Sequence, residues 1–175
     1  LELRQAELET VVEKRTKEIK EKTADIQNIF DSIEMALLTI SSGQGALDPH
    51  RSRKAEAIFD QQPDNIFDIL RDSDLAAEKM DMISTFLLSS VGEDIFNFEV
   101  NQHVLPEEIL FQVKGEAPLY LEMDWNPVTD ENDIVTKILV CIKDVTQLRE
   151  SEKVSAEKDR TISILVELLH NPIRS

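Results

Sequence analysis

Apolar residues recur at heptad spacing over the first part of the chain, where residues 1–27 contain neither glycine nor proline. Of these residues 13 are charged, so the pattern predicts one long amphipathic helix with a narrow apolar seam. The seam consists of Leu8, Val12, Ile19, Ile26 and Ile29.

Two basic residues, Arg15 and Lys22, interrupt this seam. They weaken the packing of two helices side by side, although their stems can cover apolar surface while the charges reach water. Two interpretations stay open, a parallel homodimer through this helix and a single solvated helix. We favour the homodimer because the apolar spacing is that of a coiled coil.

Short apolar runs separated by turn residues predict five strands further along the chain. The first two flank "SSGQG", residues 41–45, which holds two of the four glycines and predicts a tight turn. Both faces of the last strand are apolar, so we expect it to lie inside the sheet with both faces covered. The predicted strands are Met35–Ile40, Ala46–Pro49, Ile109–Val113, Leu119–Asn126 and Ile134–Lys143.

Between the second and third strands, from Ser52 to about Pro106, apolar residues cluster at helical spacing. The clusters predict several short helices. Residues 61–63, Gln-Gln-Pro, separate the first helix from the second, and Asp64 can cap the second.

From Val145 onward the chain is highly charged again, and a second long helix is predicted to leave the domain. Apolar residues return to coiled-coil spacing there, at Leu148, Ile162, Leu165 and Leu169. We therefore divide the chain into an N-terminal helix at residues 1–28, a mixed domain at 29–146 and a linker helix at 147–175. The linker helix is expected to lead to an output domain outside this sequence.

Net charge and cysteine content limit the ligands and the cellular compartment that we expect for this protein. The net charge of −16, from 19 basic and 35 acidic residues, argues against a general affinity for nucleic acid or anionic lipid. Cys141 is the single cysteine, which suits a reducing compartment, so we expect a cytoplasmic location. No apolar run approaches the roughly 20 residues that span a bilayer, and we expect no membrane contact by this part of the protein. Without a phosphate-binding glycine loop, catalytic triad or metal-ligand spacing, we expect no enzymatic chemistry here.

The order of a charged helix, two strands, several helices and three strands resembles a PAS sensory domain between signalling helices. The residues "DVTQLRE", 144–150, are similar to the Asp-Ile/Val-Thr motif that closes many PAS domains. The residues "LETVVEKRTKEI", 8–19, resemble the Leu-x-x-x-Val-x-x-Arg-Thr-x-Glu-Leu linkers that feed PAS and kinase modules of bacterial receptors. Trp125 and Pro127 match the aromatic-x-Pro pattern of the closing PAS hairpin.

The resemblance implies an α+β fold, a PAS-like five-stranded antiparallel sheet with helices on one side, flanked by the long N- and C-terminal helices. It implies a sensory or relay module of a bacterial sensor histidine kinase-like receptor of a two-component system. Such a module passes a conformational signal between coiled-coil helices and mediates dimerisation. Its partners would be a second copy and the upstream sensor and downstream output domains of the same chain. A regulatory piece of a nucleotide cyclase is an alternative.

A second alternative is a sensor that holds a small molecule in its core. The apolar residues available to line such a cavity are Leu38, Ile40, Met82, Phe86, Trp125 and Ile138. The same residues are also the expected packed core, and we favour that interpretation.

Flavin and haem, which other PAS domains bind, are disfavoured here. Flavin-binding PAS domains with a reactive cysteine carry it in an Asn-Cys-Arg motif on a central helix, whereas Cys141 lies on a predicted strand as a packed thiol. His103 is the nearest candidate for haem, yet a lone histidine shortly before a proline more often lies at the surface or caps a helix. We predict no cofactor and no metal site.

His170 is a candidate phosphoacceptor. Histidine-kinase acceptors lie on a coiled-coil helix after a PAS domain and are followed by Glu or Asp, an aliphatic residue and Arg. Here Asn171 and Pro172 occupy the first two positions, and Arg174 comes one position late. The mismatch favours a residue at a helix end, with the acceptor role as the alternative.

The junction after the last strand is the predicted signal-transmission point. Asp144 can accept a hydrogen bond from the first free amides of the next helix, and Gln147 completes an arrangement like a capping box. With Thr146 of the closing motif, these residues are expected to join the core strand to the output helix.

Overall fold

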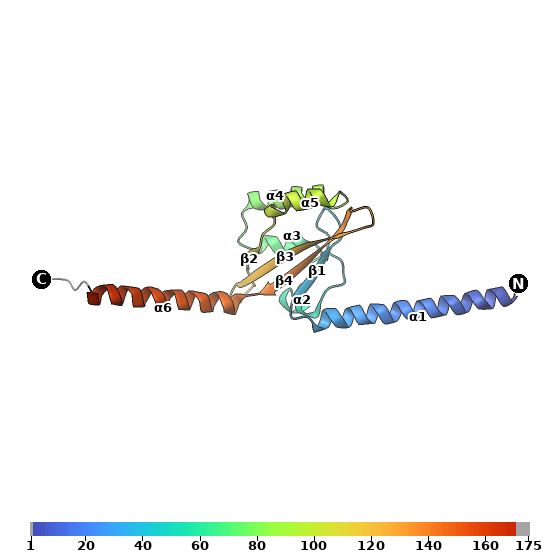
Figure 1. Cartoon of the computed structure of the whole chain (residues 1–175), viewed down its shortest axis with the longest axis horizontal. Coiled ribbons are helices and arrows are strands. Elements are labelled where there is room, and N and C mark those ends of the chain that lie inside the picture. Colours follow the sequence, from blue (N-terminus) through green and yellow to red (C-terminus); the bar gives the residue numbers. More distant parts are fainter. Residues whose placement is uncertain (1, 171–175) are drawn as a thin grey trace.

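A computed structural model describes residues 2–170, in which a mixed body carries a long helix on either side (Figure 1). The helices are α1 (Glu2–Ser32), α2 (Arg53–Ile58), α3 (Ile66–Arg71), α4 (Ala77–Ser90), α5 (Ile95–Asn101), the 3-10 turn η1 (Gln102–Val104) and α6 (Thr146–His170). The strands are β1 (Ala36–Ile40), β2 (Glu108–Phe111), β3 (Leu119–Thr129) and β4 (Val135–Asp144). Among the described residues, none of the helices combines the length and the apolarity that a membrane crossing requires.

The strands form one antiparallel sheet in the order β1-β4-β3-β2, which within residues 2–170 has four strands rather than the expected five. The expected second strand, Ala46–Pro49, contributes isolated bridges instead, of which one joins Leu47 to Ile40. Asp48 donates its N–H to Thr39 of β1 at 2.8 Å, but Leu47 donates its N–H to Asp64 at 2.8 Å and Pro49 has no N–H. This run therefore lies beside β1 without extending the ladder.

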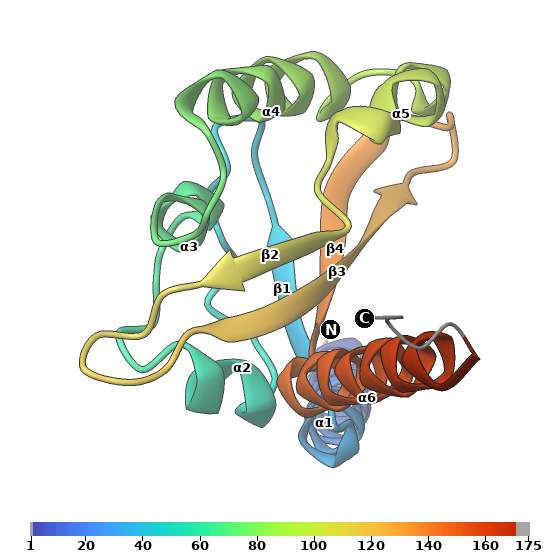
Figure 2. The same ribbon diagram turned by 90° about the vertical axis from the view of Figure 1, so that its left-hand side faces the viewer.

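The two faces of the sheet differ in burial. Inward side chains such as Leu38, Met123 and Ile138 belong to a core cluster that also draws residues from α2, α3, α4 and α5. Figure 2 shows these helices around the strands, with α4 and α5 across one end of the sheet. The outward face carries Leu139 and Cys141 of β4, which are only half-buried. The expectation that both faces of this strand are covered is wrong, because the short helices all pack on the inward face.

Side-chain caps fix where the short helices begin. Ser52 caps α2, Asn65 caps α3 and Asp94 caps α5, each accepting a hydrogen bond from a backbone N–H of the first turn. The cap of α3 thus lies one residue after the predicted Asp64. The side-chain oxygen of Asn65 lies 2.9 Å from the nitrogen of Phe67.

Two aromatic pairs occupy the space between the helices and the sheet. Phe86 of α4 and Phe98 of α5 pack edge to face with ring centroids 5.3 Å apart. Phe59, which ends α2, and Phe111 of β2 form a second such pair at 5.2 Å. Pairs with this geometry stabilise a core beyond the apolar area that they bury.

Gly45, in the turn after β1, has a φ of 86°. A Cβ atom there would lie 2.9 Å from Asn65 Oδ1 and from Ile66 Cγ2, so glycine serves both the backbone angle and the available space. We expect Gly45→Ala to lower the free energy of unfolding by about 3 kcal/mol in a denaturant titration. Gly92→Ala is the control, because Gly92 has a φ of 88° but nothing within 4 Å. The control should lose about 1 kcal/mol, and equal losses would show that the steric contact is unimportant.

α1 and α6 leave the body in opposite directions along nearly the same line (Figure 1, Figure 2). Large apolar side chains of both helices are exposed in the single chain, among them Leu8 and Ile26 of α1 and Leu148 and Leu165 of α6. The body thus lies to one side of the line along which α1 and α6 extend.

Candidate functional site

The junction between β4 and α6 is tied to β3 by hydrogen bonds. Asp144 Oδ1 accepts from the N–H of Thr146 at 3.0 Å and also from its hydroxyl. The hydroxyl oxygen of Thr146 accepts from the N–H of Tyr120 at 3.0 Å. The carbonyl of Tyr120 accepts from the N–H of Val145 at 2.9 Å. The closing motif therefore fastens the start of α6 to the neighbouring strand as well as to itself.

Two basic side chains of α6 extend this junction over the outward face of the sheet. Arg149 donates to both carboxylate oxygens of Glu108 on β2 at 2.9–3.2 Å, and also to Glu152 at 3.0 Å. These bonds, those to Glu108 first, raise the pKa of Arg149 above its ordinary value. Lys153 donates to the hydroxyl of Tyr120 at 2.6 Å, a bond that raises the pKa of Lys153. Arg149 and Lys153 therefore both carry a positive charge at physiological pH, and both contacts can form there.

Gln147 does not take part in the cap. Its side chain is exposed and forms no hydrogen bond within residues 2–170. The Oδ1 atom of Asp144 accepts hydrogen bonds from Thr146, two residues further along the chain. This short turn does not include Gln147. The further residues of this junction were not among the predicted site residues: Tyr120 of β3, Glu108 of β2, and Arg149 and Lys153 of α6. The alternation of β3 gives Tyr120 an outward position, but no local pattern shows that α6 lies beside it.

Arg149 gives a direct test of how firmly α6 is held. We expect Arg149→Met to increase the mobility of a spin label at Glu150, because the bidentate bond to Glu108 disappears. About 30% of each side chain of the Arg149–Glu108 pair is exposed, so salt can screen the pair. High salt should therefore also increase the mobility of the label in the wild-type chain, and should increase it less in the variant.

Arg160→Met is the matched control, since it removes an exposed arginine further along α6. If label mobility increases equally in both variants, or in neither, the Glu108 contact does not hold the helix.

A buried serine forms the corresponding junction at the start of the domain. Ser52 is 0% exposed. Its hydroxyl oxygen accepts from the N–H of Leu37 at 2.9 Å and from that of Ala55 at 3.2 Å, and its hydroxyl donates to the carbonyl of Met35 at 3.1 Å. One side chain thus fastens the beginning of β1 to the first turn of α2. Sequence reasoning missed this role, since a serine before a helical pattern signals a cap but not the strand behind it.

α1 and α6 meet the sheet at the same end of the same pair of strands. Ala36 of β1 pairs with Ile142 of β4. α1 ends at Ser32 and α6 begins at Thr146, so each helix terminus lies four residues from this cross-strand pair. The shortest path between the two helices crosses one strand pair and bypasses the core helices.

The predicted dimer seam of α1 lies on the surface of the single chain. All five of its members are exposed: Leu8, Val12, Ile19, Ile26 and Ile29. Exposure in one chain is what a seam between two copies requires, and the second copy stays a prediction.

Most of the predicted cavity-lining residues lie in the packed core. Leu38, Ile40, Phe86 and Ile138 are buried there. Trp125 is half-buried, and its indole N–H donates to the carbonyl of Pro106 at 2.9 Å. Met82 is 51% exposed and faces away from the core. It directly precedes the buried Ile83 on α4, and the turn of about 100° between consecutive helical residues places Met82 outside the buried face.

A surface cleft of about 800 Å³ lies between the loop after α2 and the loop after β2. Its floor is formed by Phe59, Ile69 and Phe111, and its rim includes aspartates and two basic residues: Asp60, Asp64, Asp68, Asp72, Arg71 and Lys114. It shares no lining residue with the two junctions.

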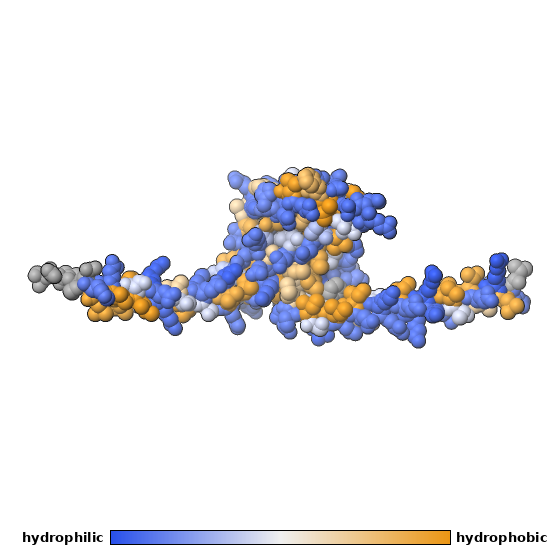
Figure 3. All heavy atoms as spheres, viewed as in Figure 1, coloured by the Kyte–Doolittle hydropathy of each residue, from blue (hydrophilic) through white to orange (hydrophobic). Residues whose placement is uncertain are grey.

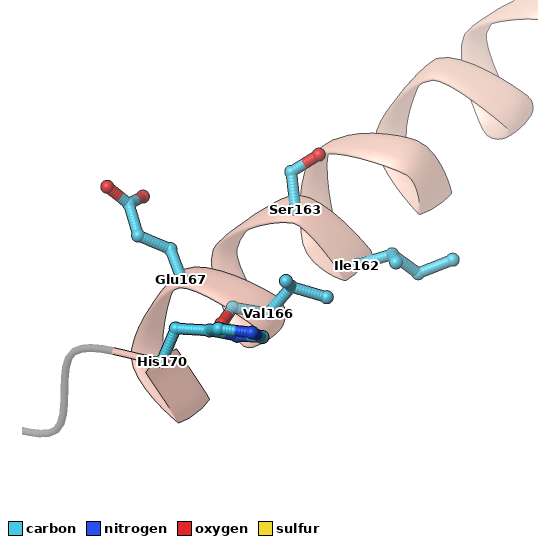
Figure 4. Close-up of a pocket in the computed structure, with 5 residues that line it drawn as sticks. All are labelled: Ile162, Ser163, Val166, Glu167 and His170. Carbon is cyan, nitrogen blue, oxygen red and sulfur yellow. The ribbon is translucent and has the colours of Figure 1, made fainter.

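A second depression runs along α6 and is lined by Ile162, Ser163, Val166, Glu167 and His170 (Figure 4). All five side chains come from one helix, so this depression is an open groove between side-chain rows rather than an enclosed ligand site.

The cysteine does not have the environment of an activated nucleophile. Burial, and then the charge of Asp124, raise the pKa of the Cys141 thiol, while a contact from Asn126 opposes them. Asn126 Nδ2 lies 3.8 Å from the sulfur. A raised pKa lowers the fraction of reactive thiolate.

Both candidate histidines are exposed on helical turns. His103 Nδ1 lies 3.2 Å from the carbonyl of Val100, and His170 Nδ1 lies 3.0 Å from that of Val166. Residues 171–175, on which the comparison with phosphoacceptor motifs depends, lie outside the described residues. Within the described part of the chain, no group of three or more His, Cys, Asp or Glu residues could hold a metal ion.

No protein-family model and no curated protein matches the chain. Among solved structures, the chain is similar to the PAS domain of an HTR-like protein from Haloarcula marismortui, with a TM-score of 0.51 and 14% sequence identity. The alignment covers 75% of this chain and 98% of that one. The body has a PAS fold.

The PAS body confirms the part of the sequence resemblance that concerns the fold. An identity of 14% establishes architecture and does not carry function from one protein to the other. The kinase context and the coiled-coil pairing of the helices stay predictions.

Proposed function

We propose that this chain is a sensory or relay module in which a PAS body passes a conformational change from α1 to α6 within a homodimer. The observation that carries the proposal is that both helices meet the sheet at one end of the β1–β4 pair. A displacement of α1 has to cross only the pair of Ala36 with Ile142 to reach the start of α6.

Each end of this path is fastened by specific contacts. Asp31 of α1 lies 3.8 Å from Arg53 of α2, and Ser52 holds the beginning of β1. At the other end, Thr146 and Arg149 hold α6 to β3 and β2. A rotation of α1 therefore has to change the tilt of β1 and β4 before it reaches α6.

A relay also needs two arrangements that differ by only a few kcal/mol, so that an upstream event can exchange their populations. Arg15 and Lys22 make the α1 seam marginal, because two of its positions are charged. The first half of α6, with Ser151, Ser155 and Lys158 at seam positions, has the same character.

The arrangement of the arms supports a parallel dimer. Because α1 and α6 lie nearly on one line, two copies placed side by side pair both arms at once (Figure 1). Apolar surface lies along the lower edge of the distal part of α6 and along α1 next to the body (Figure 3). Pairing along this edge leaves the two PAS bodies free on the outside.

For the wider context, we propose a cytoplasmic position in a two-component receptor with a histidine-kinase output. The support is the resemblance of residues 8–19 and 144–150 to the linkers and closing motif of such receptors. A nucleotide cyclase is the alternative output, and an assay of the whole protein for histidine phosphorylation or for cyclic nucleotide formation distinguishes the two. A ligand sensor is the second candidate function, and native mass spectrometry of the purified chain tests it.

The relay can be tested without knowing the natural signal. A parallel coiled coil of fixed geometry is fused ahead of Glu2, and alanines are inserted at the fusion one at a time up to a full heptad. Each insertion rotates α1 by about 100°. Disulfide cross-linking of single cysteines between Ile162 and Leu169, in a Cys141→Ser background, reports the response of α6. We expect the cross-linking pattern to change with insertion and to return after one heptad.

The control inserts the same residues behind a flexible glycine-rich linker, which transmits no rotation. A pattern that stays constant through the rigid series would refute the relay, because the imposed rotation would then end within the body.

A further inference from the structure

The surface cleft of about 800 Å³ belongs to neither junction. Figure 2 shows the two loops that enclose it, residues 59–65 between α2 and α3 and residues 112–118 between β2 and β3. Five apolar side chains line it: Ile58, Phe59, Ile69, Phe111 and Val113. A cleft of this volume with an apolar lining can accommodate a small organic molecule.

Acidic side chains outnumber basic ones around the apolar lining. The acidic residues are Asp60, Asp64, Asp68 and Asp72, and the basic ones are Arg71 and Lys114. Asp68 pairs with Arg71 at 3.2 Å, whereas the other three aspartates and Lys114 form no ion pair within residues 2–170. Three carboxylates without an ion pair therefore face one such cation, in a chain whose net charge is −16. This balance attracts a positively charged ligand and disfavours an anionic one.

The carboxylates of the cleft do not form a metal site. Hard metal ions need several oxygen ligands around one point. Across residues 2–170, His, Cys, Asp and Glu side chains nowhere come together in a group of three or more that could hold a metal ion. Separate charges around an apolar floor fit a ligand that combines a positive group with an apolar body.

Both walls of the cleft are held by hydrogen bonds within the body. The N–H of Gln112 donates to the carbonyl of Asp72 at 2.7 Å, which ties the end of β2 to the end of α3. On the opposite wall, the carbonyl of Pro63 accepts from Arg51 Nη1 at 3.0 Å. Arg51 is only 8% exposed and does not line the cleft, so it fixes the loop without adding a charge to the rim. Binding to walls that are already in place costs little conformational entropy.

We propose that this cleft binds a small organic cation with an apolar body, of which an arylalkylammonium ion is the simplest example. The apolar body packs on the floor, and the ammonium group lies at the rim near the carboxylates of Asp60, Asp64 and Asp72. The site is separate from a cavity in the core, because neither Leu38 nor Ile138 lines it. Binding here goes beyond the proposed relay and does not depend on it, since no lining residue takes part in the contacts that hold α1 or α6.

An NMR titration of isotope-labelled residues 1–175 with phenethylammonium measures both the affinity and the location of binding. We expect the amides of Gln62 and Lys114 to shift and to saturate, while those of Leu38 and Ile138 stay unchanged. Phenethyl alcohol lacks the charge, and methylammonium lacks the apolar body. Each of these two compounds should bind at least about 10-fold more weakly than phenethylammonium.

Substitutions at the rim test the role of its charges. Asp64→Asn combined with Asp72→Asn should weaken binding of phenethylammonium by about 10-fold, because two carboxylates lose their charge while the side-chain shape is kept. The control combines Asp81→Asn with Asp159→Asn, which removes the same charge from exposed positions outside the cleft. It should change the affinity by less than about 2-fold. Lys114→Gln should strengthen binding by about 2-fold, a gain that misfolding cannot produce.

Four results would overturn the proposal. They are equal affinities for phenethylammonium and phenethyl alcohol, a loss in the control pair as large as that in the rim pair, and no shift of the cleft amides at about 20 mM phenethylammonium. The fourth is a shift of the Leu38 and Ile138 amides with the cleft amides unchanged, which would place the ligand in the core instead.

Discussion

Ser52→Ala is expected to lower the free energy of unfolding by about 3 kcal/mol, since it leaves buried donors at Leu37 and Ala55 and the Met35 carbonyl without their partner. The side chain is fully buried, so water cannot replace the lost bonds without opening the junction. Chemical denaturation measures the loss. Hydrogen exchange should show the Leu37 amide opening first, because the hydroxyl is its acceptor.

Asp94→Ala is the matched comparison for this variant. The Asp94 side chain caps α5 by accepting from the N–H of Phe96 at 2.9 Å, but the residue is exposed and this carboxylate bonds to no second element among the described residues. It should cost about 1 kcal/mol, the usual value of a helix cap. If Ser52→Ala costs no more than Asp94→Ala, Ser52 is a cap alone and does not hold β1 to α2.

Thr146→Val keeps the shape of the side chain and removes its oxygen. We expect a loss of about 1–2 kcal/mol, because the Tyr120 amide loses its acceptor and Asp144 loses one of its two donors. The functional effect should be larger than this loss suggests, since the hydroxyl joins the first residue of α6 to the backbone of β3. In the insertion series, we expect the heptad response of α6 to weaken while the dimer itself persists.

Thr161→Val provides the internal control. Its hydroxyl donates to the Glu157 carbonyl within α6 at 2.9 Å and contacts no other element. Its removal should change the free energy of unfolding by about 0.5 kcal/mol or less. A Thr146→Val chain that loses stability but keeps the full insertion response would show that the bond stabilises the junction without transmitting through it.

Much of the body could be predicted from local patterns. The period-two alternation from Leu119 and the continuous apolar run up to Ile142 correctly indicated two long strands. The Asp-Val-Thr sequence correctly marked where the sheet ends and α6 begins. These features are encoded by neighbours in sequence, because side-chain periodicity and capping act over a few residues.

Other features of the fold depended on contacts between elements that are distant in the sequence, which a local residue pattern does not predict. The run Ala46–Pro49 looked like a strand, but the Leu47 amide bonds to Asp64 before α3, and Asp48 alone of the run donates its N–H to β1. Met82 looked like a core residue, but Ile83 took the inward position on α4. Burial is decided by which helix face meets the sheet, and a short apolar cluster does not specify that face.

Some residues of the candidate site could likewise be predicted from the local sequence, whereas others depend on distant contacts. Asp144 and Thr146 were found from the sequence, because their contact spans two residues. Glu108, Tyr120 and Ser52 were not, because each acts on a residue at least 15 positions away in the chain. The charge spacing of α6 gave no indication that Arg149 reaches back to β2.

The sequence by itself determined the order of the elements, the two charged helices and the seams along them. The tertiary structure alone decided that both helices join the sheet at the pair of Ala36 with Ile142. The reason is physical: periodicity and caps are short-range, whereas the pairing of β1 with β4 joins segments about 100 residues apart through backbone hydrogen bonds that are the same for every sequence. Only the packed sheet shows that the entry and the exit of the domain are neighbours.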